Sequence, residues 1–169
     1  MPGTLDRPSP AVTVDFAAWL PRHRRSAGAA RRLLRTFLAG LDGAEPLLEV
    51  GELLVGELVA NAVEHARGPS GRLVEVRYAV SAGRLRIEVH DAGNELPEVR
   101  EPAPEEESGR GLWLVRELAA AWGCCPREGG AGKCVWAVVG PPAPPGGGLP
   151  GQPATELPAP AATGREAAA

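Results

Sequence analysis

The sequence is poor in lysine, has no long apolar run and carries little net charge. Lys133 is the only lysine beside seventeen arginines, an imbalance that we attribute, with the abundant alanine, glycine and proline, to GC-rich codons. No stretch approaches the roughly 18 consecutive apolar residues of a membrane span, and the N-terminus lacks the basic, then apolar pattern of a secretory signal. The net charge of −3 argues against general nucleic-acid affinity. We therefore expect no membrane association and no direct nucleic-acid partner.

Cysteine is also scarce, with Cys124, Cys125 and Cys134 as an odd set of three. Adjacent cysteines are poorly placed to pair with each other, and no second Cys/His cluster completes a zinc site. We therefore expect three reduced thiols in a cytoplasmic protein.

The length of 169 residues favours a single domain. We predict a disordered N-terminus at residues 1–8, a folded domain at residues 9–140 and a flexible tail at residues 141–169. In that tail 21 of 29 residues are proline, glycine or alanine, a composition with nothing to bury in a core.

Hydrophobic periodicity predicts four strands and three helices in the folded domain. The predicted strands cover residues 11–16, 73–80, 84–91 and 134–139, and the predicted helices cover residues 22–41, about 46–66 and about 111–122. The order β-α-α-β-β-α-β predicts a mixed, mostly antiparallel sheet with helices on one face, which is a two-layer α/β sandwich. Six arginines lie on the first predicted helix, and we interpret them as its solvated polar face. A contact with a partner protein is the second interpretation, and a contact with nucleic acid is the third.

Glu57 and Asn61 stand four residues apart in an otherwise apolar helical pattern. Residues at this spacing share one face of a helix. Asparagine is a poor helix former because its side chain competes for backbone hydrogen bonds. Surface exposure is one explanation. The other is that both side chains direct oxygens at a hard cation and its ligand, since Mg²⁺ prefers oxygen donors.

Asp91 ends a strand in which Leu85, Ile87 and Val89 share one face, and the period of two places the aspartate on that face. A lone buried carboxylate is costly unless it is hydrogen-bonded. Either the backbone turn that contains Gly93 satisfies it, or a ligand does.

A glycine-containing segment opens the third predicted helix, and its residues are Gly109, Arg110, Gly111 and Leu112. Helix N-termini offer unpaired amides that suit phosphate, glycines allow close backbone approach, and Arg110 can add a charged contact. An ordinary loop is the alternative. The segment lacks the third glycine and the preceding strand of a dinucleotide-binding loop.

Three segments, Glu57–His65, Val89–Asn94 and Ser108–Val115, follow one another in a specific order. Together they resemble the N, G1 and G2 boxes of the ATPase superfamily that includes gyrase, the large heat-shock chaperones, sensor histidine kinases and mismatch-repair ATPases. Within it, the chain is most similar to the small bacterial anti-sigma serine/threonine kinases, over roughly residues 9–140. The resemblance implies the Bergerat fold, with ATP and Mg²⁺ as cofactors.

The resemblance also implies roles for single residues. Asn61 would hold the metal, Glu57 would be the catalytic residue that orients or deprotonates the attacking group, and Asp91 would read the adenine amine. The remaining nucleotide contacts would come from Gly93, Gly109, Arg110, Gly111 and Leu112. The implied activity is transfer of the ATP γ-phosphoryl group to a Ser or Thr of an antagonist protein. The implied partners are a sigma factor, an anti-sigma factor antagonist protein or both and, in a homodimer, a second copy of the chain.

Other functions stay open. Glu95 stands where the superfamily often has a second glycine, which favours a non-catalytic regulatory module. A sensor histidine kinase fragment needs an upstream helical hairpin that carries a phospho-accepting histidine. The one candidate, His23, stands in a short arginine-rich stretch with no room before it for such a hairpin. DNA binding is a further alternative that rests on the arginine-rich helix alone. Lys133 is either an edge-strand lysine that discourages aggregation or a ligand contact.

Overall fold

The computed structural model describes residues 13–65, 72–93, 95, 97, 110–127 and 131–141. The two ends predicted to be disordered, residues 1–8 and 141–169, lie outside this part of the chain except for Pro141. Gly109 of the predicted glycine segment also lies outside it.

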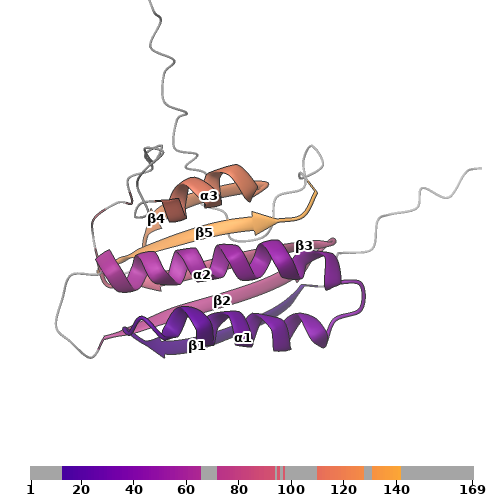
Figure 1. Cartoon of the computed structure of the whole chain (residues 1–169), viewed down its shortest axis with the longest axis horizontal. Coiled ribbons are helices and arrows are strands. Elements are labelled where there is room, and N and C mark those ends of the chain that lie inside the picture. The colour runs from indigo at the N-terminus through magenta and orange to yellow at the C-terminus, as the bar shows by residue number, and fades with distance from the viewer. Residues whose placement is uncertain are drawn as a thin grey trace, which may run out of the picture.

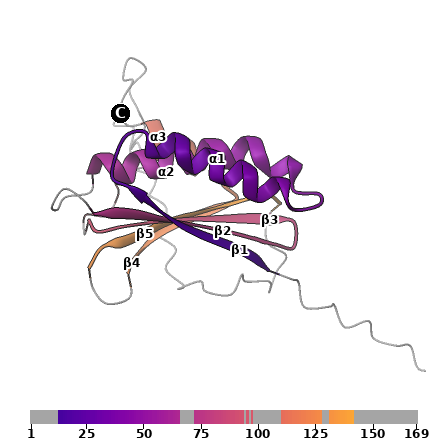
Figure 2. The same ribbon diagram turned by 90° about the horizontal axis from the view of Figure 1, so that it is seen from below.

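Two layers make up the fold, a five-stranded sheet and a layer of helices on one of its faces (Figure 1, Figure 2). The strands are β1 Val14–Pro21, β2 Leu73–Ser81, β3 Arg84–Asp91, β4 Ala121–Pro126 and β5 Lys133–Val139. The helices are α1 Ser26–Ala39, α2 Leu48–His65 and α3 Arg110–Leu118, and a 3-10 turn at Glu45–Leu47 leads into α2. The predicted α/β sandwich is thereby confirmed.

The strand order is β1-β2-β3-β5-β4, so β5 is an interior strand and β4 lies at an edge. All four strand pairs are antiparallel, and the mixed component that we expected is not found among the described strands. The pairing of β3 with β5 sets Asp91 opposite Lys133 and His90 opposite Cys134. These two neighbouring pairs lie on opposite faces of the sheet, because successive side chains of a strand alternate.

The sequence prediction was wrong about residues 119–126. The third helix ends at Leu118 rather than near Trp122, and a fifth strand, β4, follows. The backbone N–H of Ala120 already donates to the carbonyl of Val138 at 2.8 Å, which starts the pairing with β5. Gly123 is needed within β4, because a Cβ there would lie 2.7 Å from the ring of Trp136.

The core lies between the helices and the inner face of the sheet. Helix α2 crosses its centre, and a Cβ added at Gly51 would lie 2.9 Å from a methyl group of Leu85 on β3, so helix and sheet are in close contact. Tyr78 is fully buried and donates its hydroxyl to the carbonyl of Ala30 on α1 at 2.9 Å. Among the described residues, every helix is too short or too polar to cross a membrane.

Candidate functional site

Four chain segments meet at one end of the sheet: the C-terminal half of α2, the end of β3, and the beginnings of α3 and β5 (Figure 1). Helix α2 and strand β3 run in the same direction from the contact between Gly51 and Leu85. Ten helical residues rise about 15 Å, and six strand residues rise about 20 Å. Asn61 and Asp91 are therefore brought to the same end of the fold.

Asp91 forms a buried ion pair with Lys133. The Nζ atom of Lys133 lies 3.1 Å from Oδ1 of Asp91, and the two side chains are 3% and 1% exposed. The predicted position of Asp91 on the inner face of β3 is confirmed, because Leu85, Ile87 and Val89 are buried in the same core. Burying two opposite charges together avoids the much larger cost of burying either one alone.

The two carboxylate oxygens of Asp91 differ in their contacts. Oδ1 accepts both from Lys133 and from the backbone N–H of Gly93, at 2.7 Å. Oδ2 is buried, and no described residue donates a hydrogen bond to it. The sequence left open whether the turn at Gly93 or a ligand satisfies this carboxylate. The turn donates to one oxygen, and the second oxygen keeps its capacity to accept a hydrogen bond from a ligand.

Gly132 is a site residue that sequence reasoning missed, and Lys133 was left there between two interpretations. The interpretation of Lys133 as an edge-strand lysine is wrong, because β5 lies between β3 and β4 and the side chain is buried. Gly132 has a φ of 101°, and a Cβ there would overlap the carbonyl oxygen of Asp91. A lysine directly before an apolar strand was the available signal, but its partner depends on a strand register that the sequence does not show.

The carboxylate of Glu57 lies against the first turn of α3. A Cβ added at Gly111 would stand only 2.6 Å from Oε2 of Glu57, so glycine permits the close approach of the two helices. This contact brings two of the predicted site segments together. The first amides of a helix lack partners within it and create a positive potential that attracts anions, which suits both a carboxylate and a phosphate.

Asn61 lies one turn beyond Glu57 on α2 and is half-buried. Surface exposure therefore does not explain why an asparagine stands in the middle of this apolar helix. Among the described residues, neither the Asn61 amide nor the Glu57 carboxylate is engaged in a hydrogen bond or ion pair. Two oxygen-bearing groups on one half-buried helix face are suited to a hard cation.

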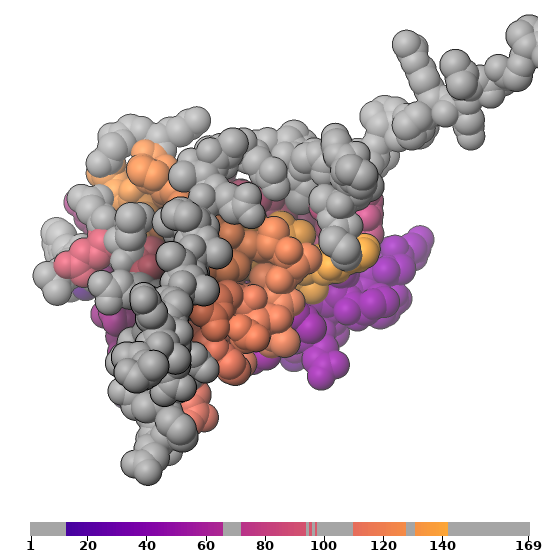
Figure 3. Space-filling model, turned by 90° about the horizontal axis from the view of Figure 1, so that it is seen from above, coloured from indigo at the N-terminus to yellow at the C-terminus, as the bar shows by residue number. Residues whose placement is uncertain are grey.

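The other predicted residues of this segment have different surroundings. Arg110 is exposed as the first residue of α3, and the Leu112 side chain is buried in the core, which leaves its backbone amide as the group that can bind phosphate. In the space-filling view, α3 and β4 form one continuous patch of the surface (Figure 3). Gly109 lies outside the described residues.

The arrangement joins three chemical capacities at one end of the sheet. A buried carboxylate keeps one acceptor atom for a donor group, the start of a helix provides amides for an anion, and α2 presents side-chain oxygens for a cation. A nucleoside triphosphate with a divalent metal needs all three. The residues present therefore fit ATP and Mg²⁺ chemically.

Comparison with known proteins gives an independent result. The family model described as the histidine kinase-like ATPase domain matches residues 20–139. No curated protein matches the chain. A structure of the RsbU and RsbW domains of Rv1364c from Mycobacterium tuberculosis is similar in fold, with a TM-score of 0.56 and 20% identity. The match covers 75% of this chain and 32% of that one.

A second structure is a histidine kinase domain from the Erythrobacter litoralis EL346 blue-light activated histidine kinase. It aligns with a TM-score of 0.40 and 23% identity over 71% of this chain and 61% of its own. The similarity to the Rv1364c structure establishes the fold alone. This chain spans about a third of the length of the Rv1364c chain.

Proposed function

Because the chain belongs to the histidine kinase-like ATPase domain family, we propose that it binds ATP with Mg²⁺ and acts as an anti-sigma-factor-type protein serine/threonine kinase. The observation that carries the proposal is Oδ2 of Asp91, a buried acceptor to which no described residue donates. The exocyclic amine of adenine would donate to this atom. Guanine has a carbonyl at the same position, which would leave two acceptors facing each other without a proton.

The neighbouring residues have matching roles. The side-chain oxygen of Asn61 would hold the metal, and the first amides of α3, with Arg110, would bind the phosphates. Lys133 and the Gly93 amide hold the Asp91 carboxylate in one orientation, so that Oδ2 is pre-positioned for the base. Bound ATP supplies the phosphoryl group, while Mg²⁺ neutralises charge on the phosphate oxygens.

Glu57 is the residue that we propose for catalysis. It lies one helical turn before Asn61 and against the start of α3, which would place its carboxylate beside the terminal phosphate. From there it can accept the proton of a Ser or Thr hydroxyl and orient the oxygen for attack. The partners we propose are a sigma factor and an anti-sigma factor antagonist protein, and the fold shared with a structure that contains an RsbW domain is consistent with them.

A second candidate function is a regulator that binds partners without transferring phosphate. The close approach of the Glu57 carboxylate to Gly111 favours it, because a carboxylate at a helix N-terminus occupies the place where a phosphate would bind. Under this alternative, Glu57 stabilises the junction of α2 and α3.

Calorimetric titration with ATP, with and without Mg²⁺, tests the site. Wild type is expected to bind ATP more tightly with Mg²⁺, and Asn61→Ala to lose that metal-dependent gain. His65→Ala, on an exposed residue one turn further along α2, serves as the matched control and should behave as wild type. Absence of ATP binding, or an unchanged Mg²⁺ effect in Asn61→Ala, would refute the site. GTP is expected to bind far more weakly than ATP.

Glu57→Gln separates the two functions, since it removes the charge and keeps the shape. A kinase should retain ATP binding in this variant and lose transfer of radiolabelled phosphate to the antagonist. If wild type binds ATP but labels no antagonist, the non-catalytic function is the correct one.

A further inference from the structure

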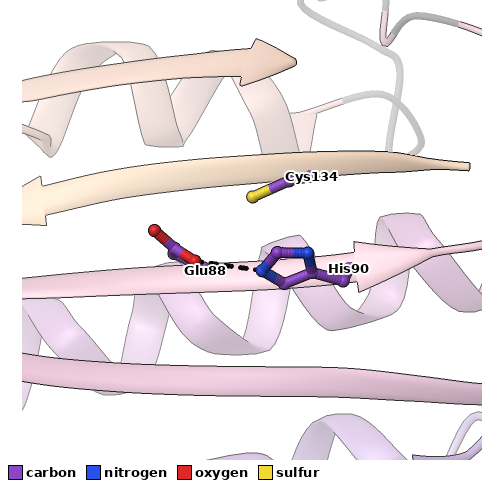
Figure 4. Close-up of side chains that lie close together, drawn as sticks. All are labelled: Glu88, His90 and Cys134. Atoms are coloured by element: carbon purple, nitrogen blue, oxygen red, sulfur yellow. Dashed lines mark hydrogen bonds and ion pairs between the residues drawn. The ribbon is translucent and has the colours of Figure 1, made fainter. Parts of the chain in front are cut away.

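A second cluster of chemically active side chains lies on the face of the sheet turned away from the helices. Glu88 and His90 come from β3 and Cys134 comes from β5, and Figure 4 shows them gathered on that face with the helices behind. Their position follows from the register. Leu85, Ile87 and Val89 face the core, so the residues between them face the other way, and His90 is the direct cross-strand partner of Cys134.

The geometry of this cluster is close to that of a metal site. The ligand atoms of the three residues all lie within 4.8 Å of one another, and Nε2 of His90 is 3.0 Å from Oε2 of Glu88. Tetrahedral zinc with ordinary bond lengths would hold nitrogen and oxygen about 3.4 Å apart and nitrogen and sulfur about 3.6 Å apart. Glu88 and His90 share one strand, and Cys134 lies directly opposite His90 on the next strand.

We propose that Glu88, His90 and Cys134 bind a zinc ion. An imidazole, a thiolate and a carboxylate are all ordinary zinc ligands, and thiolate favours zinc over magnesium or calcium. Three protein ligands leave the fourth tetrahedral position for water. Carboxylate and thiolate together carry two negative charges, which balance the ion.

Neighbouring groups both support and oppose binding. Nε of Arg86 donates to the other oxygen of Glu88, Oε1, at 2.7 Å, and such outer contacts hold a ligand in orientation. The guanidinium charge itself opposes a cation, but it lies 4.4 Å from the centre of the Trp136 ring, whose face attracts it. Burial raises the pKa of the Cys134 thiol, so zinc binding must release its proton to solvent.

The site is also accessible. The side chains of Glu88 and His90 are 21% and 13% exposed, so an ion can reach them from solvent. The sequence predicted no zinc site, because these three residues form no cluster in the order of the chain. Pairing of β3 with β5 assembles the ligands across 44 residues.

The tag-free 169-residue chain, kept reduced with a phosphine and free of nucleotide, is titrated with zinc and separately with cobalt. Wild type is expected to bind one zinc ion per chain. With cobalt it should show the ligand-field bands of a tetrahedral site and a sulfur-to-cobalt charge-transfer band. Cys134→Ser should lose the charge-transfer band, and both Glu88→Gln and His90→Gln should weaken zinc binding by at least about tenfold, since even outer contacts are worth that much.

Cys124→Ser is the matched control, because Cys124 is also a buried thiol of this sheet but faces the helix-side core. This variant should bind zinc as wild type does. Circular dichroism checks that each variant is folded, and Glu88→Gln keeps the shape of the side chain should Cys134→Ser unfold. Absence of zinc binding by wild type, or unchanged affinity in folded Cys134→Ser or Glu88→Gln, would overturn the proposal. Its failure would leave the ATP site untouched, since the titration contains no nucleotide.

Discussion

Replacing Lys133 by methionine tests the buried ion pair most directly. The methionine keeps an apolar chain of similar length and removes the charge that lies 3.1 Å from Asp91. The carboxylate would then stay buried with the Gly93 amide as its described donor. Removing one partner of a buried pair costs about 3–5 kcal/mol, because the remaining charge is left without compensation. That is a large part of the roughly 5–15 kcal/mol that stabilises a typical domain.

The double variant Lys133→Met, Asp91→Asn removes both charges. Replacing a whole buried pair is often neutral, so the double variant should recover most of the loss and show coupling of at least about 2 kcal/mol in a double-mutant cycle. Urea unfolding at neutral pH measures each free energy. Arg35→Met is the control, because the Arg35–Glu52 pair has an arginine that is 60% exposed and should cost no more than about 1 kcal/mol. Additive single costs, or a loss below about 1 kcal/mol in Lys133→Met, would contradict the reasoning.

Two further predictions concern single positions. Gly132→Ala should lower the free energy of unfolding by clearly more than the about 1 kcal/mol expected for a left-handed residue alone, because its methyl group would overlap the carbonyl of Asp91. Gly83→Ala, with a φ of 71° and open space around it, is the control, and equal losses in denaturant unfolding would refute the overlap argument. Tyr78→Phe removes the hydroxyl that donates to Ala30 and should cost about 1 kcal/mol, and no loss in the same assay would mean that this bond adds nothing.

Much of the fold could be predicted because local pattern and tertiary environment agree. Alternation along β3 gave its bounds, Arg84–Asp91, and its inner face correctly, since each inward residue meets the core. Strand β4 was missed because its six residues, Ala121–Pro126, form a short run directly after α3. A short apolar run can continue a helix or form a strand. The pairing with β5 that decides between them is a long-range contact.

The candidate site also has features that follow from local sequence pattern and features that depend on contacts between distant segments. The face shared by Glu57 and Asn61 follows from helical spacing, and the inward direction of Asp91 follows from strand alternation, so both could be inferred locally. The ion pair with Lys133, the need for glycine at position 132 and the approach of Gly111 to Glu57 depend on contacts between distant segments. No periodicity in the sequence carries that information.

The register between β3 and β5 is therefore the structural feature on which both proposed sites depend. It sets Asp91 opposite Lys133 on the helix side, and the preceding pair, His90 and Cys134, on the other face. A shift of one residue would turn every side chain of a strand to the opposite face. It would expose the apolar row of β3 and separate both pairs at once. The apolar core that selects this register thus also sets the positions of the Asp91 carboxylate and the Cys134 thiol, on which the two proposed sites depend.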